Sequence, residues 1–368
     1  MSKAAELAKW GEVSTNGQVS GRRNIVINGA MNVAQRSASV TGIGATSGYY
    51  TIDRYQIISG ATAGRFTMAQ VADVHDGFAN AMKLTCTTAD ASIAAGEYMG
   101  IHYRIEGQDL QQIKKGTSDA EKVTISFYVK GNASATYMLE VKDSDNTRLN
   151  HNQFAVTTDW TRIEITLNAD TTGAFTDDNG LSLELSFWLH GGSTYTSGTY
   201  TANTWAGQTN ANRLVGISSF FDSTDRTFFL TGLQMEVGSQ ATPFEHRSFG
   251  EELALCQRYC QVRGTSGNAN EVFQWGAGNG TTTMTAISQL PITMRTRPTV
   301  VATASDYQVY NFVDAALKDC SGLSLITSIS SDHLAYIDWT CASMTNAAFC
   351  LLRNDGTANR IFILQAEL

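Results

Sequence analysis

The chain has 368 residues with a formal net charge of −8, and only 16% of its residues are charged. That length allows two or three domains, and the negative charge argues against binding along a nucleic acid backbone. There is no run of about 18 apolar residues, so we expect no membrane insertion. The six cysteines are irregularly spaced, which is typical of small buried thiols and not of a disulfide framework.

The first segment, residues 1–23, is expected to contain a short helix and a linker. SKAAELAKW forms about one or two helical turns, which present Leu7 and Trp10. A helix of that length is marginal by itself, so we expect this apolar pair to contact a neighbouring chain or a partner. The opening MSKAAELAKWGEV lacks the apolar centre of a signal peptide, and we therefore expect folding in a cytosol.

Residues 24–247 contain about ten short segments rich in β-branched and aromatic residues, each bounded by Gly, Asn, Asp or Ser. Apolar residues alternate with polar ones in several of them, as at Val123, Ile125 and Phe127. Alternation with a period of two indicates strands with one buried and one hydrated face. We therefore predict an antiparallel β-sandwich.

A connecting helix is predicted over residues 248–263. Ser248 opens an S-x-x-E capping box, and Leu255, Tyr259 and Val262 recur on one helical face. The helix lies between two β regions that have cores of their own. We therefore expect Leu255 and Tyr259 to be buried at a subunit contact or against both domains.

Residues 264–368 predict a second β region, with strand-like runs such as TTMTAISQL, HLAYIDWT and AAFCLLRN. Pro298 lacks a backbone donor, so it should start a strand or mark an edge strand. The chain ends in the apolar run IFILQAEL, and we expect this last strand to be paired.

No motif for catalysis or metal binding stands out. The six histidines never lie within four residues of one another, and no nucleophile, phosphate-loop or dinucleotide motif occurs. The oxygen-rich run at 177–180 would suit calcium, but its Asn-Gly pair is a strong hairpin signal and we favour a turn. We predict no catalytic residue, no metal site and no cofactor.

Aromatic side chains give the one positive indication of binding. Tyr195, Tyr200 and Trp205 lie in a segment rich in Gly, Thr, Ser and Asn, where exposed rings would suit the C–H faces of a sugar. The alternative is that these rings pack their loop onto the sandwich or at a subunit contact. A second aromatic group falls in the C-terminal region, where packing in the strand core is the default; its members are Trp275, Tyr307, Tyr310 and Trp339.

Three blocks of sequence resemble a family of phage tail-fibre-like virion proteins. They are NIVINGAMNVAQRS with the later YYTIDRY, the run GLQMEVG–ATPFEHRS–GEELALCQRY within 232–259, and LPITMRTRPTVVATA at 290–304. Residues 49–238 also resemble jelly-roll carbohydrate-binding modules, in the order GFANAMKLTCT, VTISFYVKG, TDWTRIEITL and TFFLTGLQMEV. Such modules often hold calcium through acids in the closing strand. Here Glu236 is the only acid of that strand, so the resemblance does not support calcium.

The resemblance implies a virion structural protein of a tailed phage, a tail fibre or receptor-binding protein that acts as a homotrimer. Residues 1–23 would attach to other virion proteins, 24–247 would form a jelly-roll body, 248–263 would pack on the threefold axis, and 264–368 would form a distal head. Such a protein is assembled in the host cytoplasm, becomes part of the phage tail, and binds a glycan or protein receptor on the host surface without catalysis. The rival function is a capsid-surface or baseplate decoration protein with no glycan affinity, and a secreted polysaccharide-degrading enzyme fits least.

Overall fold

The computed structural model describes residues 22–264, 270–357 and 360–368. Strands dominate it, which confirms the predicted class of a jelly-roll β-sandwich and a second β domain joined by a short helix. The chain divides into two compact units, Met1–Glu252 with Leu368, and Leu253–Glu367. Leu7 and Trp10 fall outside the described residues. No helix within the described ranges is long and apolar enough to cross a membrane.

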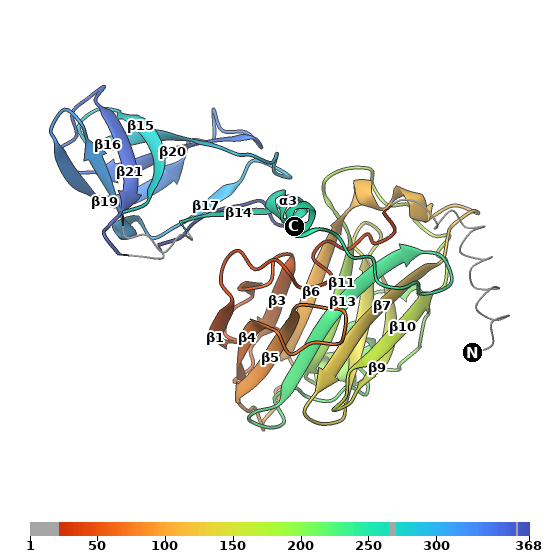
Figure 1. Ribbon diagram of the computed structural model, residues 1–368. Helices are drawn as coiled ribbons and strands as arrows, with labels where there is room; N and C mark the ends of the chain where they lie inside the picture. The colour runs from red at the N-terminus through yellow and green to blue at the C-terminus, as the bar shows by residue number, and fades with distance from the viewer. Residues whose placement is uncertain (1–21, 265–269, 358–359) are drawn as a thin grey trace. The chain divides into compact units, whose positions relative to one another are not determined.

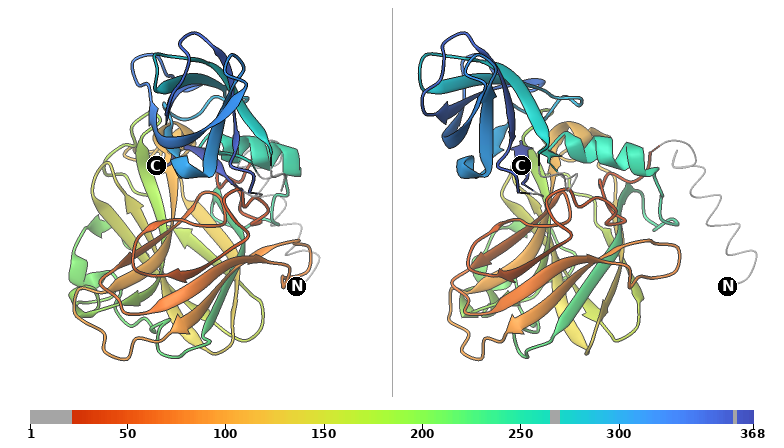
Figure 2. Two further views of the ribbon diagram at one scale, coloured as in Figure 1. Left: turned by 90° about the vertical axis from the view of Figure 1, so that its left-hand side faces the viewer. Right: turned by 60° about the vertical axis from the view of Figure 1, so that its left-hand side comes forward.

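The N-terminal unit is a sandwich of two antiparallel sheets stacked face to face (Figures 1 and 2). The six-stranded sheet has the order β1 (Ser39–Ile43), β4 (Arg65–Val71), β5 (Ala81–Thr88), β13 (Thr227–Val237), β7 (Val123–Gly131), β10 (Thr161–Leu167). The seven-stranded sheet has the order β12 (Ala206–Gly207), β9 (Arg148–Val156), β8 (Ala135–Asp143), β11 (Leu181–Gly191), β6 (Tyr98–Glu106), β3 (Tyr55–Gly60), β2 (Gly48–Tyr49). Single helical turns connect some strands: η1 (Gly107–Asp109), η2 (Gln111–Ile113), α2 (Ser193–Thr196) and η3 (Asn210–Asn212).

The core of the sandwich is built by the alternating residues of both sheets. Ile125, Phe127 and Val129 of β7 are fully buried and belong to one continuous cluster with Phe187 of β11. The ring of Phe127 meets that of Phe187 edge to face, with centroids 5.0 Å apart. The predicted burial of alternate residues on the inner face is therefore confirmed. The prediction of a hydrated outer face is wrong for the first half of β7, where Thr124 and Ser126 are buried as well.

The residues of the ATPFEHRS block tie the first described segment to the closing strand β13. Glu236 accepts hydrogen bonds from the backbone N–H (2.8 Å) and the hydroxyl (2.7 Å) of Thr242. Glu245 accepts the backbone N–H of Asn24 at 2.9 Å, and the guanidinium of Arg247 donates to the carbonyl of Asn24. Charged groups that hold backbone donors and acceptors fix an irregular segment more firmly than neutral ones.

The connecting helix α3 spans Phe249–Gln257 and is shorter than predicted. The hydroxyl of Ser248 accepts the backbone N–H of Glu251 at 3.3 Å, so the serine half of the predicted capping box is confirmed, whereas the carboxylate of Glu251 pairs with Arg22. The prediction of a helix through residue 263 is wrong, because Cys260–Arg263 form strand β14 and pair with β22 (Phe362–Gln365). Tyr259 therefore lies after the helix, buried, and shares no helical face with Leu255, which is partly buried.

The C-terminal unit contains a closed antiparallel barrel and a three-stranded sheet. The barrel order is β15 (Val272–Gly278), β16 (Thr283–Gln289), β20 (Leu334–Cys341), β19 (Ala316–Leu325), β18 (Tyr307–Asn311), β21 (Phe349–Asn354). The small sheet has the order β14, β22, β17 (Thr299–Val301), and the turn η4 (Ala304–Asp306) precedes β18. The last strand β22 is paired on both sides, and Pro298 directly precedes the edge strand β17, as predicted.

Trp339 lies at the centre of the barrel core. It is fully buried, its ring packs against that of Tyr307 with centroids 5.1 Å apart, and its indole Nε1 donates to the side-chain oxygen of Gln274 at 2.9 Å. A buried indole needs such a partner, since an unpaired N–H in a core is costly. Trp339 and Tyr307 thus have the core role that was the default for the C-terminal aromatic group.

Candidate functional site

A row of apolar side chains crosses the outer face of the barrel. In the strand register, Ile287 of β16 lies opposite Trp275 of β15, and Trp275 lies opposite Leu351 of β21. Leu351 in turn lies opposite Tyr310 of β18, and Tyr310 lies opposite Leu317 of β19. Directly paired residues point to the same side of a sheet, so these five side chains form one continuous row over five strands.

Two further rings widen this row. Phe349, at the start of β21, stacks on Trp275 with centroids 5.4 Å apart and an interplanar angle of 18°. Phe312 packs against both Phe349 (5.3 Å) and Tyr310 (4.9 Å). The row and these two rings are called the aromatic band below; its members are Trp275, Ile287, Tyr310, Phe312, Leu317, Phe349 and Leu351.

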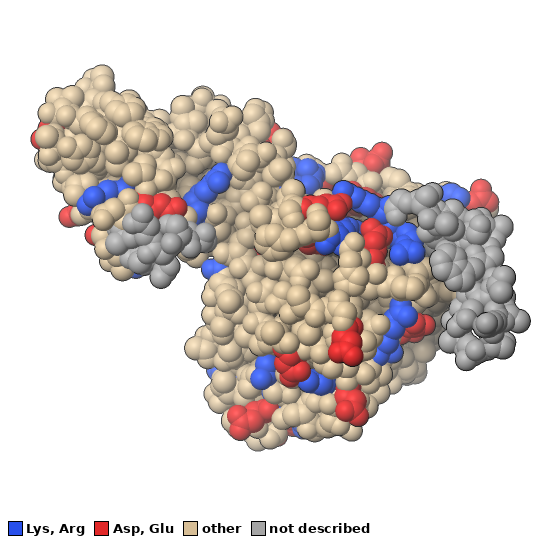
Figure 3. Space-filling view, in the orientation of Figure 1, with Lys and Arg blue, Asp and Glu red and all other residues tan. Residues whose placement is uncertain are grey.

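The aromatic band is exposed to solvent. Trp275 is 54% exposed, Phe349 is 53% exposed and Phe312 is 47% exposed. Of the eleven exposed large hydrophobic side chains within the described ranges, five belong to the band. Figure 3 shows few charged side chains on the visible face of the barrel. Contiguous exposed apolar patches usually mark a binding surface, because isolated monomers seldom keep them.

Polar side chains run along one side of the aromatic band. Arg353 donates to the side-chain oxygen of Gln308 at 3.1 Å, and the amide of Gln308 donates to the carboxylate of Asp319 at 2.8 Å. Gln308 is two residues before Tyr310 in β18, so both point outward. A flat aromatic surface beside a guanidinium, an amide and a carboxylate can stack on apolar C–H faces and bond hydroxyl groups at the same time.

The sequence predicted only some of the residues of the aromatic band. It named Trp275 and Tyr310 but assigned them to the core by default, and the structure places both on the outer face. Phe349 and Phe312 were missed. The run FCLL at 349–352 is apolar at every position, so no local signal in the sequence separates the exposed Phe349 from the buried Cys350 and Leu352.

The structure does not bring the three predicted loop aromatics onto one surface. Tyr195 and Tyr200 pack against a small cluster around Trp188, and the hydroxyl of Tyr200 accepts the backbone N–H of Gln153 at 3.0 Å. Trp205 instead packs on the main sandwich core. All three side chains are partly buried, and their role as a glycan platform stays a prediction.

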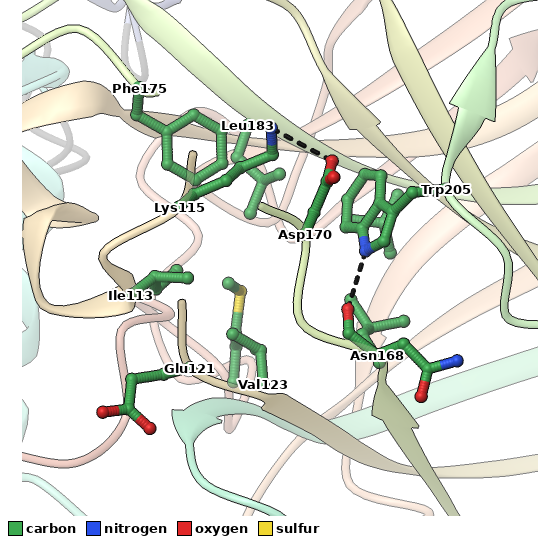
Figure 4. Close-up of a pocket in the computed structure, with 12 residues that line it drawn as sticks. Ile113, Lys115, Glu121, Val123, Asn168, Asp170, Phe175, Leu183 and Trp205 are labelled. Atoms are coloured by element: carbon green, nitrogen blue, oxygen red, sulfur yellow. Dashed lines mark hydrogen bonds and ion pairs between the residues drawn. The ribbon is translucent and has the colours of Figure 1, made fainter. Parts of the chain in front are cut away.

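Trp205 lines a small pocket at one end of the sandwich (Figure 4). Its indole Nε1 donates to the carbonyl of Asn168 at 2.8 Å. The ammonium of Lys115 lies 5.8 Å from the ring centroid of Trp205, 5.3 Å from that of Phe175 and 3.2 Å from the Asp170 carboxylate. The pocket is lined mainly by apolar side chains, and its charged members are Lys115, Glu121 and Asp170.

The ammonium of Lys115 is surrounded by oxygen atoms. Besides Asp170 it contacts the carboxylate of Asp143 at 2.6 Å and the carbonyls of Thr172 (2.7 Å) and Gly173 (2.8 Å). The Lys115 side chain is 2% exposed and that of Asp143 is fully buried. Burial by itself raises the pKa of Asp170, but hydrogen bonds from a neighbouring arginine and from Lys115 lower it. Lysine supplies the positive charge that this buried acidic pair requires.

Two carboxylates on the seven-stranded sheet are held ionised. Burial by itself raises the pKa of Glu140, but hydrogen bonds from Arg213 and His151 lower it to about 2. Burial acts in the same direction on Glu184, whose pKa is also lowered to about 2, in this case by His102 and by an arginine beside it. A general acid requires a raised pKa, so neither group is suited to protonate a leaving group.

One group within the described ranges has the spacing of a metal site. Ligand atoms of Asp90, Glu97 and His190 all lie within 4.8 Å of one another, and the three residues are buried. Their polar atoms already have protein partners: Asp90 accepts the hydroxyl of Thr62 at 2.9 Å, and His190 Nε2 lies 3.2 Å from the Glu97 carboxylate. The arrangement is that of a satisfied polar cluster in the wall of the sandwich.

Comparisons with known proteins give structural similarity only. No family model matches the sequence, and no curated protein matches it. The enzymatically active domain of tailspike protein 4 of bacteriophage CBA120 is 11% identical, covering 58% of this chain and 21% of that structure, with a TM-score of 0.29. A family 11 carbohydrate-binding module of Clostridium thermocellum is 13% identical (57% and 100% covered, TM-score 0.27).

A third structure, described as a putative sugar binding protein from Bacteroides thetaiotaomicron, is 12% identical (58% and 100% covered, TM-score 0.32). The solved structures that resemble this chain thus include a phage tailspike domain and carbohydrate-binding β folds. Identities and TM-scores this low leave the function to be argued from the residues of this chain.

Proposed function

We propose that this chain is a virion protein of a tailed phage, a tail fibre or receptor-binding protein, and that it binds glycans on the host surface through the aromatic band of its barrel. The observation that carries the proposal is the continuous exposed row through Trp275, with Phe349 stacked beside it. The three sequence blocks that resemble tail-fibre-like proteins support the virion role.

The chemistry of the band suits a sugar ligand. Covering the exposed ring faces with the C–H face of a pyranose removes apolar surface from water, which is favourable. Arg353, Gln308 and Asp319 then provide donors and acceptors beside the rings, at the place where sugar hydroxyls project. Such a contact is weak for one site, and a homotrimer would raise the overall avidity by about 10²–10⁴.

We propose binding without catalysis. Glycoside hydrolysis requires a pair of carboxyl groups, one of which keeps its proton near neutral pH. With pKa values of about 2, neither Glu140 nor Glu184 keeps its proton near neutral pH, which supports a non-catalytic role for the seven-stranded sheet. In this proposal residues 1–23 attach the chain to other virion proteins and α3 contributes Leu255 to the trimer contact.

The test measures binding of the full-length chain to host cells and to a panel of envelope glycans. We expect Trp275→Ala and Phe349→Ala to weaken binding at least tenfold, while the melting temperature stays close to that of the wild type because both rings are exposed. Ile329→Ala is the matched control, since Ile329 is 54% exposed but lies outside the band. Unchanged binding by both ring variants would refute the assignment.

A structural decoration protein is the second candidate, because Ile287, Leu317 and Leu351 give the aromatic band aliphatic members that offer no hydrogen bonds to a sugar. The band would then contact a second copy of this chain or another virion protein. Leu317→Asp separates the two functions, since a charge in an apolar contact disrupts assembly. Light scattering would show dissociation of the oligomer if the band is a subunit contact, and an unchanged mass if it is a glycan site.

A further inference from the structure

Two thiols face each other inside the barrel. Cys320 of β19 lies directly opposite Cys341 of β20, and their sulfur atoms are 3.4 Å apart. Both side chains are buried in the barrel core, with 3% and 1% exposure. The third thiol of this core, Cys350, donates to the carbonyl of Ala348 and is opposed in the register by residues other than cysteine.

The local backbone leaves room for the two sulfurs to approach. The register of β19 shifts between Cys320 and Gly322, which is the mark of a β-bulge next to the first cysteine. On the far side of β20, Cys341 is fixed by its backbone N–H, which donates to the carbonyl of Thr282 at 2.8 Å. A disulfide requires the sulfurs to close from 3.4 Å to about 2 Å, a shift that a bulged strand can absorb.

From this juxtaposition we infer that Cys320 and Cys341 form a cross-strand disulfide when the protein leaves a reducing compartment. The oxidant is a small-molecule disulfide. The thiolate of one cysteine attacks a sulfur of the oxidant, forms a mixed disulfide and releases the first thiolate leaving group. The second cysteine attacks the mixed disulfide and releases the other half of the oxidant. Two electrons and two protons pass from the cysteine pair to the oxidant, which becomes two thiols.

Either thiol can start the exchange, because either sulfur can donate the hydrogen bond that joins them. The thiol of Cys320, which is hydrogen-bonded to Cys341 and buried, has a raised pKa. The same hydrogen bond lowers the pKa of Cys341. The attacking species is the thiolate, and both thiols are buried. Burial makes this step slow, so it requires transient opening at this end of the barrel.

The role of the disulfide rests on the proposed function, although its chemistry does not. A virion protein folds in a reducing cytosol and then works outside the cell, where no chaperone or thiol reductant maintains it. The bond would close the chain between β19 and β20 and restrict its unfolded state. The barrel that carries the aromatic band would therefore become more resistant to unfolding after release.

The experiment counts thiols in the full-length chain. The protein is unfolded, refolded in a redox buffer of reduced and oxidised glutathione, and compared with a sample kept in dithiothreitol. We expect the denatured thiol count to fall from six to four in the oxidised sample, with a higher melting temperature that dithiothreitol reverses. Refolding removes the barrier of burial, so a native refolded protein that keeps six thiols would overturn the inference.

Peptide mapping identifies the bond. Cleavage before aspartate separates Cys320, in residues 319–331, from Cys341 and Cys350, which share residues 338–354. We expect these two peptides to be linked in the wild type and in Cys350→Ser, and unlinked in Cys341→Ser. Persistence of the link in Cys341→Ser, or a link between chains, would show that another pair reacts and would also overturn the inference. Glycan binding is not measured here, so failure of the proposed function gives a different result.

Discussion

Replacing Lys115 with methionine should destabilise the sandwich strongly. The change keeps the length of the side chain and removes an ammonium that contacts the buried carboxylates of Asp143 and Asp170 at 2.6 and 3.2 Å. Asp170 keeps its ion pair with Arg148 at 2.8 Å, but Asp143 loses its only ion pair with a described residue. Removing one partner of a buried pair costs about 3–5 kcal/mol, because the remaining charge stays uncompensated.

The assay is thermal unfolding followed by circular dichroism at neutral pH. For a unit of this size, 3–5 kcal/mol corresponds to a decrease of roughly 6–20 °C in melting temperature. Lys114→Met is the matched control, since the adjacent Lys114 pairs with Glu121 at 3.0 Å but its side chain is 53% exposed. Exposed pairs contribute little, and we expect that variant to melt within about 2 °C of the wild type.

A double variant checks the mechanism. Adding Asp143→Asn to Lys115→Met removes the negative charge that has lost its partner. We therefore expect the double variant to recover part of the stability lost in Lys115→Met. If Lys115→Met melts like Lys114→Met, or if the second change destabilises further, then the electrostatic account of this cluster is wrong.

Three other outcomes follow from the contacts described. The pKa of Glu140 is about 2 in the folded chain and 4.5 in the reference state, so its ionised form stabilises the sandwich above pH 4.5, and this stabilisation is lost as the pH falls toward 2. Glu140→Gln should therefore flatten the acid limb of a plot of melting temperature against pH, and an unchanged limb would contradict this. Trp205→Ala removes the hydrogen bond to Asn168 and packing against the core, so calorimetry should show a loss of about 2–4 kcal/mol, whereas an unchanged melting point with lost cell binding would favour the glycan platform. Trp339→Phe leaves the Gln274 amide oxygen without its donor, which should destabilise the barrel by about 1–3 kcal/mol. The thermal unfolding transition of the sandwich should stay in place, and a single shifted transition would show that the two units unfold together.

Local patterns predicted the strands and the cap but not the contacts between distant segments. The predicted burial of Ile125 and Phe127 is a local consequence of burying one sheet face, and it was confirmed. The polar Ser126 between them was expected to be hydrated but is buried, because other parts of the fold cover the outer face there. The helix end was misplaced because Tyr259 and Val262 satisfy a helical period equally well, and only pairing with β22 decides for a strand.

The candidate site was harder to predict than the fold. Lys115 has no local signal, since its partners Asp143 and Asp170 lie far along the chain and meet it only through the sandwich topology. Likewise, the pairing of strands around the barrel decides whether an aromatic residue in a strand faces the core or the solvent, and its local sequence does not. Trp339 and Trp275 occupy similar strand sequences, yet one is fully buried and the other is half exposed.

The closed barrel limits how anything can recognise the C-terminal unit. In an open sheet, a partner can add a strand to an edge and bond to backbone groups whatever its sequence. The six strands of this barrel pair in a complete ring, so their backbone groups are already occupied by neighbouring strands. A ligand on this ring must be recognised through side chains, and its specificity can therefore change by substitution of single surface residues while the pairing of the strands stays intact. Such a scaffold allows the preference for a ligand to change without remodelling of the fold.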